Sequence, residues 1–304
     1  MAKAKWVTSI KSWCRSDDQQ SDSHLWLSDD KILAFRTDSV GRRYAVKVDT
    51  ATGSEMPLIA LNTRLLRHGH APSFWELSPD RKWMLWIDHS LPKTWNVASL
   101  DGSKFMSYPH PGVNVDWDMT IAHWTCDSRR WGELIGDRLS LYNLKQPKAE
   151  KTVFVSEPQN VTIIFLCGFD VKGEAIAAMD GPGPTFIKFG TTSRFAPGHQ
   201  LPISPGMHYL DDIELAPQGE KVAWICGARK DTPAMMQWLP RVLRPHLWDR
   251  PIEEVWVADL DGTHQHRLGY VEGYNGDLKD IRWSPDGKRL SFLHQSALYI
   301  VSAQ

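Results

Sequence analysis

Short segments in which apolar and polar residues alternate recur along this chain, and tight turns separate them. The clearest example spans 281–293, where two such segments flank Ser284, Pro285, Asp286 and Gly287. Proline presets φ for a turn, aspartate caps it, and glycine accepts a positive φ. Alternation on both sides of a tight turn is typical of two antiparallel strands. The segment therefore predicts a β-hairpin.

The hairpin pattern occurs six times. Its equivalent turn positions are Ser28, Ser78, Thr125, Asp170, Ala216 and Ser284. Consecutive positions lie 45–50 residues apart, except the last, which follows after 68. A repeat of this length that is rich in strands has the size of one propeller blade.

The better-preserved copies carry a family resemblance. Segments 75–86 and 281–293 contain Ser-Pro-Asp before a strand, and segments 95–103 and 255–263 contain Leu-Asp-Gly after another. This pattern resembles the TolB-like, WD40-like β-propeller repeat of the PD40 type, over nearly the whole chain. The resemblance implies an all-β fold, and we expect one domain, 1–304, forming a six-bladed propeller with four-stranded antiparallel blades. Many members of this family work in the bacterial cell envelope.

The last predicted blade lacks a strand. Its segments 278–283, 289–294 and 297–302 are strand-like, and the sequence then ends. An unpaired outer edge exposes backbone hydrogen-bonding groups. Segment 5–10 near the N-terminus alternates and is β-prone, so we expect it to supply the fourth strand and close the ring.

The innermost strand of each blade has two faces. Positions one and three residues before each turn position are apolar, which predicts a face packed against the next blade. Positions two and four residues before it include ionisable residues, which we expect to converge at the central channel. These candidate ligand-binding residues are His24, Glu76, His123, Asp212, Glu214, Asp280 and Arg282. They either pair with one another in a wet channel or form a ligand site.

The fifth predicted blade carries an insertion at about 228–251, between its second and third strands. It combines apolar residues with arginines, which is unusual for a loop, and contiguous exposed apolar area marks interfaces. Either its apolar side covers the propeller or it binds a partner. The candidate partner-binding residues are Met235, Trp238, Leu239, Arg241, Arg244 and Trp248.

Composition narrows the function classes. Lysine plus arginine (35) balance aspartate plus glutamate (36), so we expect no nucleic-acid partner. We expect no transmembrane segment, because no apolar stretch is long enough. No signal peptide is visible, so we expect a cytoplasmic protein, or a periplasmic one if a leader was removed. The cysteines lack metal-ligand spacing, and nucleophile-elbow and phosphate-loop motifs are absent, so we expect no metal, cofactor or catalytic triad.

Two functions fit these residues. The first is a monomeric, non-enzymatic scaffold that binds a protein or peptide through the channel mouth and the insertion. The alternative is a lyase or hydrolase, acting on small molecules or carbohydrates, with an acid–base or metal site at the channel mouth.

Overall fold

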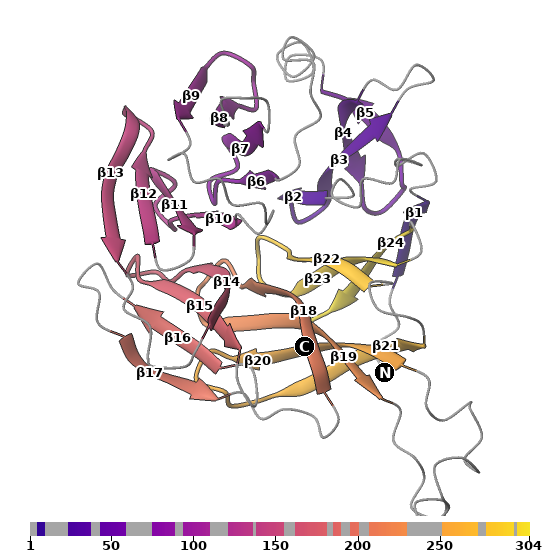
Figure 1. Cartoon of the computed structure of the whole chain (residues 1–304). Coiled ribbons are helices and arrows are strands. Elements are labelled where there is room, and N and C mark those ends of the chain that lie inside the picture. Colours follow the sequence, from indigo (N-terminus) through magenta and orange to yellow (C-terminus); the bar gives the residue numbers. More distant parts are fainter. Residues whose placement is uncertain are drawn as a thin grey trace, which may run out of the picture.

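A computed structural model gives the fold of the chain (Figure 1). It describes residues 5–9, 24–37, 43–58, 75–88, 94–109, 121–135, 138–154, 162–180, 185–189, 195–200, 207–229, 251–272, 278–294 and 297–304. Within these ranges the strands form six antiparallel sheets of four strands each. No helix in the described ranges is long and apolar enough to cross a membrane.

Each of the first three sheets is a meander of consecutive strands. The first contains β2 (His24–Ser28), β3 (Lys31–Thr37), β4 (Arg43–Asp49) and β5 (Glu55–Pro57). The second contains β6 (Trp75–Leu77), β7 (Trp83–Asp88), β8 (Thr94–Ser99) and β9 (Phe105–Pro109). The third contains β10 (Ile121–Trp124), β11 (Arg130–Ile135), β12 (Arg138–Asn143) and β13 (Gln146–Phe154).

The next two sheets repeat this order, and the last one does not. The fourth contains β14 (Thr162–Phe169), β15 (Ala175–Asp180), β16 (Thr185–Phe189) and β17 (Phe195–Gln200). The fifth contains β18 (Met207–Leu215), β19 (Lys221–Arg229), β20 (Pro251–Asp259) and β21 (His266–Glu272). The last contains β22 (Leu278–Trp283), β23 (Arg289–His294), β24 (Ala297–Ser302) and β1 (Lys5–Ser9).

The sheets surround a common centre. Their innermost strands β2, β6, β10, β14, β18 and β22 contact one another in chain order, and β22 also contacts β2 (Figure 1). Contact between the last and the first innermost strand closes the ring. The predicted all-β propeller is confirmed.

The ring is completed by strands from the two ends of the sequence. β1 pairs antiparallel with β24, with Lys5 opposite Ile300 and Ser9 opposite Ala297. The outer edge of β24 is thereby paired, and the predicted role of the N-terminal segment is confirmed.

Apolar side chains fill the spaces between neighbouring sheets. One buried cluster joins the first and second sheets through Leu25, Phe35, Trp75 and Trp86, and Phe35 stacks on Trp75 with ring centroids 3.8 Å apart. Similar clusters lie between other neighbouring sheets. Burying one large apolar side chain contributes roughly 2–3 kcal/mol. The predicted apolar positions of the innermost strands are buried at every sheet except at Leu27, which is half-buried.

The turn after each innermost strand is held by its own side chains. At Ser284 the hydroxyl donates to Asp286 Oδ1 (2.6 Å) and accepts the backbone N–H of Arg289 (2.9 Å). Gly287 has a φ of 66°, as a turn of this kind requires. The turns therefore end the innermost strands at one common face of the propeller, called the turn face below.

Candidate functional site

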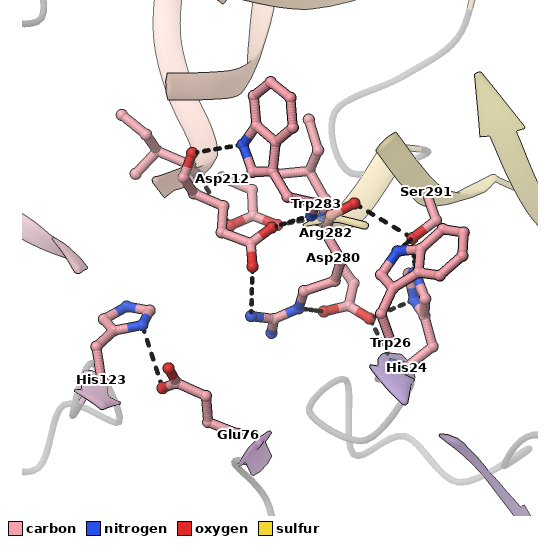
Figure 2. A network of polar contacts seen from close by, with 12 residues as sticks. His24, Trp26, Glu76, His123, Asp212, Asp280, Arg282, Trp283 and Ser291 are labelled. Atoms are coloured by element: carbon pink, nitrogen blue, oxygen red, sulfur yellow. Dashed lines mark hydrogen bonds and ion pairs between the residues drawn. The ribbon is translucent and has the colours of Figure 1, made fainter. Parts of the chain in front are cut away.

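The innermost strands bring ionisable side chains from several sheets to the centre (Figure 2). Irregular pairing helps to aim them. The register between β22 and β23 shifts between Lys279 and Arg282, and Asp280 in this bulge has a φ of 55°. A second bulge interrupts β18 between Leu210 and Asp212. Bulges bend a strand and redirect a side chain, so these two direct Asp280 toward β2 and Asp212 toward β22.

The central carboxylates accept hydrogen bonds from the backbone of the next sheet. The four bonds run from Ile281 N to Asp212 (2.8 Å), from Trp283 N to Glu214 (2.6 Å), from His24 N to Asp280 (2.7 Å) and from Trp124 N to Glu76 (3.2 Å). An innermost strand is the edge of its sheet, so its outward N–H groups lack a ladder partner. Each carboxylate therefore fastens one sheet to the next.

A buried network joins the last sheet to the first (Figure 2). His24 Nδ1 lies 2.7 Å from Asp280 Oδ2, and His24 Nε2 lies 2.5 Å from Ser291 Oγ. The same hydroxyl accepts a hydrogen bond from Trp26 Nε1 at 2.8 Å. Because the side chain of His24 is fully buried, these contacts stabilise the closure of the ring.

Arg282 is the central cation of this network. Its Nε donates to Asp280 Oδ1 at 2.9 Å, and its Nη1 lies 3.9 Å from Glu214 Oε1. Burial alone would raise the pKa of Asp280, but Arg282 and His24 outweigh it and lower that pKa to about 2. Burial would likewise lower the pKa of Arg282, and the surrounding carboxylates raise it instead. The Arg282–Asp280 pair is therefore ionised at neutral pH.

The two acidic residues of β18 behave differently. Burial raises the pKa of Glu214 to about 8, because Arg282 and the N–H of Trp283 only partly offset the loss of hydration. Burial also raises the pKa of Asp212. Glu214 is therefore largely protonated at neutral pH.

Glu76 and His123 form a separate pair. His123 Nδ1 lies 3.1 Å from Glu76 Oε2, and Figure 2 shows no contact between this pair and the network of Arg282. The carboxylate orients the imidazole ring between the second and third sheets.

A cavity of about 90 Å³ lies between these groups. Glu76, His123, Glu214 and Arg282 line it, together with Arg81. Pro79 and Pro217, which lie in the turns after β6 and β18, also line it, so the cavity lies toward the turn face. Trp26, Trp124 and Trp283 also contribute to its wall.

The structure thus divides the seven predicted channel residues into two groups. Glu76, His123, Glu214 and Arg282 line the cavity. His24, Asp212 and Asp280 lie two residues earlier in their strands than a lining residue and are not among the lining residues themselves. The sequence predicted that all seven converge at the central channel, and that the insertion lies over one mouth of it. The cavity lies toward the turn face, whereas β19 ends and β20 begins at the opposite face. The cavity is near the turn face because residues of the turns form part of its wall.

The insertion lies outside the described residues, apart from its first two positions and its last. The six candidates Met235, Trp238, Leu239, Arg241, Arg244 and Trp248 therefore stay a prediction. Among the described residues, no group of three or more His, Cys, Asp or Glu side chains is arranged to hold a metal ion.

Sequence reasoning missed Arg81. It lies in the turn after β6, at the position that three other repeats fill with Gly173, Gly219 and Gly287. The signal was present in the aligned repeats, because an arginine replaces a turn glycine there.

Comparison with known proteins identifies the fold but no family. No protein-family model matches the chain, and no curated protein sequence matches it either. Similar solved structures include a putative TolB from Agrobacterium tumefaciens, with a TM-score of 0.54 and 12% identity, covering 93% of this chain and 90% of that one. Oligogalacturonate lyase from Vibrio parahaemolyticus has a TM-score of 0.56 and 11% identity, covering 100% and 94%. Hydrazine synthase from Kuenenia stuttgartiensis has a TM-score of 0.55 and 13% identity, covering 92% and 75%. At these identities the similarity establishes an all-β propeller fold, which unrelated functions share.

Proposed function

We propose that this six-bladed, four-stranded propeller is a non-enzymatic module that binds a protein or peptide partner. The partner would contact the turn face and insert one side chain or chain end into the central cavity. A cavity of about 90 Å³ suits a group of that size. Arginine and tryptophan, which contribute strongly to interfaces, form part of its wall.

This proposal depends on one observation: the central carboxylates accept backbone hydrogen bonds that hold the sheets together. A general acid or base must exchange a proton with its substrate. Both oxygens of Asp212 instead accept backbone N–H groups, from Ile213 and Ile281, each at 2.8 Å. One oxygen of Glu214 and one of Glu76 are used in the same way. These groups are better placed to hold the sheets together than to react.

The test is selection of binding peptides from a random library, followed by affinity measurement on rim variants. Pro79→Trp and Pro217→Trp each add an indole beside the cavity, and we expect both to weaken peptide binding. Pro57→Trp is the matched control, because Pro57 is an exposed proline on β5, outside the lining. Failure to select any peptide, or equal affinity for all three variants, would contradict the proposal.

The insertion is proposed as a second contact surface for the same partner. It joins β19 to β20 at the face opposite the turns, so a partner using both surfaces must reach around the fifth sheet. Changing Trp238, Leu239 and Trp248 to serine should weaken binding of a full-length partner. Unchanged affinity would remove this surface from the proposal.

An acid–base enzyme is the second candidate, because one observation favours it. With a pKa of about 8, Glu214 holds a proton near neutral pH and lines the same cavity as the His123–Glu76 pair. A lyase or hydrolase would use Glu214 as the acid and His123 as the base. A panel of glycans, polyuronates and esters tests this, with metal analysis of the purified protein. Turnover that Glu214→Gln abolishes would favour the enzyme.

A further inference from the structure

Arg81 occupies a backbone conformation that suits glycine. Its φ is 57°, close to the values of 77°, 70° and 66° at the equivalent Gly173, Gly219 and Gly287. Side chains other than glycine rarely adopt this region, because the Cβ atom crowds the backbone. Such strain persists where the surrounding structure holds it, and it gathers at binding sites. Ser128, at the equivalent position of the third repeat, has the same φ of 57°, but Arg81 is the one of the two that lines the cavity.

The side chain of Arg81 enters the central cavity without a partner there. Its Nε is buried and makes no hydrogen bond, and no ion pair joins its guanidinium to the described residues. Burial lowers the pKa of Arg81, while Glu214 and Glu76 oppose this shift from a distance. Arg81 as a residue is half-buried, and leaving its buried Nε without a hydrogen bond to the described residues is costly unless a ligand supplies one.

Arg282 contributes a second guanidinium to the same cavity. Asp280 accepts a hydrogen bond from its Nε, but its Nη1 is 3.9 Å from Glu214 Oε1, beyond hydrogen-bond distance. Asp280 is the ionised counter-ion of Arg282, so the charge of Arg81 remains to be balanced in the cavity. Of the two lining carboxylates, Glu214 is largely protonated at neutral pH, and Glu76 already contacts His123.

We propose that Arg81 and Arg282 together bind a carboxylate group of a ligand inside the cavity. This inference rests on the proposed function and names its ligand chemistry, an acidic side chain or the C-terminal carboxylate of the partner. The planar guanidinium group donates two parallel hydrogen bonds to a carboxylate. Protonated Glu214 can donate a further hydrogen bond to the same group.

The size of the cavity supports a small planar anion. About 90 Å³ accommodates a carboxylate and the methylene groups next to it. The remainder of the ligand would leave past Pro79 and Pro217 on the turn face.

The first test uses succinate as a probe, with its uncharged analogue succinamide, in calorimetric titrations of the full chain at pH 7. Arg81→Gly should raise the Kd for succinate at least about tenfold. Losing a hydrogen bond between a guanidinium and a carboxylate weakens binding by about this factor. Arg129→Gly is the matched control, because it removes an exposed arginine from the next turn, outside the cavity. Succinamide should bind weakly to every variant.

Folding of the variant is checked by its melting temperature. Arg81→Gly introduces the residue that suits a positive φ, so we expect the Tm of this variant to equal or exceed that of the wild type. Succinate that does not bind the wild type, binds Arg81→Gly equally well, or binds no better than succinamide would overturn the carboxylate site.

Peptides selected for binding show whether the carboxylate comes from a side chain or from the C-terminus. They also test the carboxylate site separately from the binding module. Amidating the C-terminus abolishes binding if the chain end is bound, and replacing Asp or Glu by the amide does so if a side chain is bound. Peptides that bind Arg81→Gly as well as the wild type would refute the carboxylate site and leave the binding module standing. If succinate binds in an Arg81-dependent manner but no peptide binds, the carboxylate site stands and the binding module is refuted.

Discussion

Glu214→Gln should change how the stability of the protein depends on pH. The folded protein raises the pKa of Glu214 from its ordinary value of 4.5 to about 8, mainly by burial. The folded state therefore holds a proton that the unfolded chain has released above pH 4.5. Stability from this group is present below pH 4.5 and is lost as the pH rises toward and through 8.

The magnitude follows from the size of the shift. One pKa unit corresponds to about 1.4 kcal/mol, so a rise to about 8 implies about 5 kcal/mol at most. The side chain keeps 20% of its surface exposed, and water there screens part of the effect. We expect wild-type protein to lose about 2–4 kcal/mol of its free energy of unfolding, relative to Glu214→Gln, between pH 5 and pH 8.

The assay is urea denaturation of both proteins at several pH values across this window. Glutamine resembles the protonated acid and keeps an oxygen that accepts the N–H of Trp283. Glu220→Gln is the matched control, because it removes an exposed glutamate from the turn between β18 and β19. If the free energies of unfolding of wild type and Glu214→Gln run parallel across the window, the burial argument for Glu214 is wrong.

Three further outcomes test the closure of the ring and its central charges. Deleting residues 1–9 should lower the Tm sharply, because β24 loses its partner; an unchanged melting curve would contradict the closure. Ser291→Ala should cost about 1–3 kcal/mol, by leaving Trp26 Nε1 and His24 Nε2 buried without the hydroxyl, and Ser291→Thr should recover part of it in the same denaturation assay. Asp280→Asn should cost about 3–5 kcal/mol at pH 7, since a buried guanidinium loses its counter-ion; a loss under 1 kcal/mol would refute that role.

Much of the fold could be predicted because it depends on local patterns. The alternation of Ile281 and Trp283 against Arg282 predicted which face of β22 is buried, and the Ser-Pro-Asp-Gly turn predicted where that strand ends. The missing fourth strand of the last sheet predicted the pairing of β1 with β24. These inferences needed only the two-residue period of apolar positions, the residue types of the turns, and the requirement that backbone hydrogen-bonding groups be paired.

The candidate site was less predictable, because it depends on how neighbouring sheets are placed. Alternation predicted that Asp212, Glu214 and Asp280 lie at the centre, but not that each accepts a backbone N–H from the next sheet. The bulge at Asp280 follows from tertiary contacts, and no residue type announces it. Arg81 was read as part of a turn, so its entry into the cavity was missed.

Pairing of β1 with β24 has a consequence for biosynthesis. The strand that leaves the ribosome first must wait for the one that leaves last, which at about 5–20 residues per second takes roughly 15–60 s. Until then the apolar faces between the first and last sheets are exposed to solvent, and the unclosed propeller is prone to aggregate. A nascent chain stalled before β24 should therefore be a preferred client of chaperones.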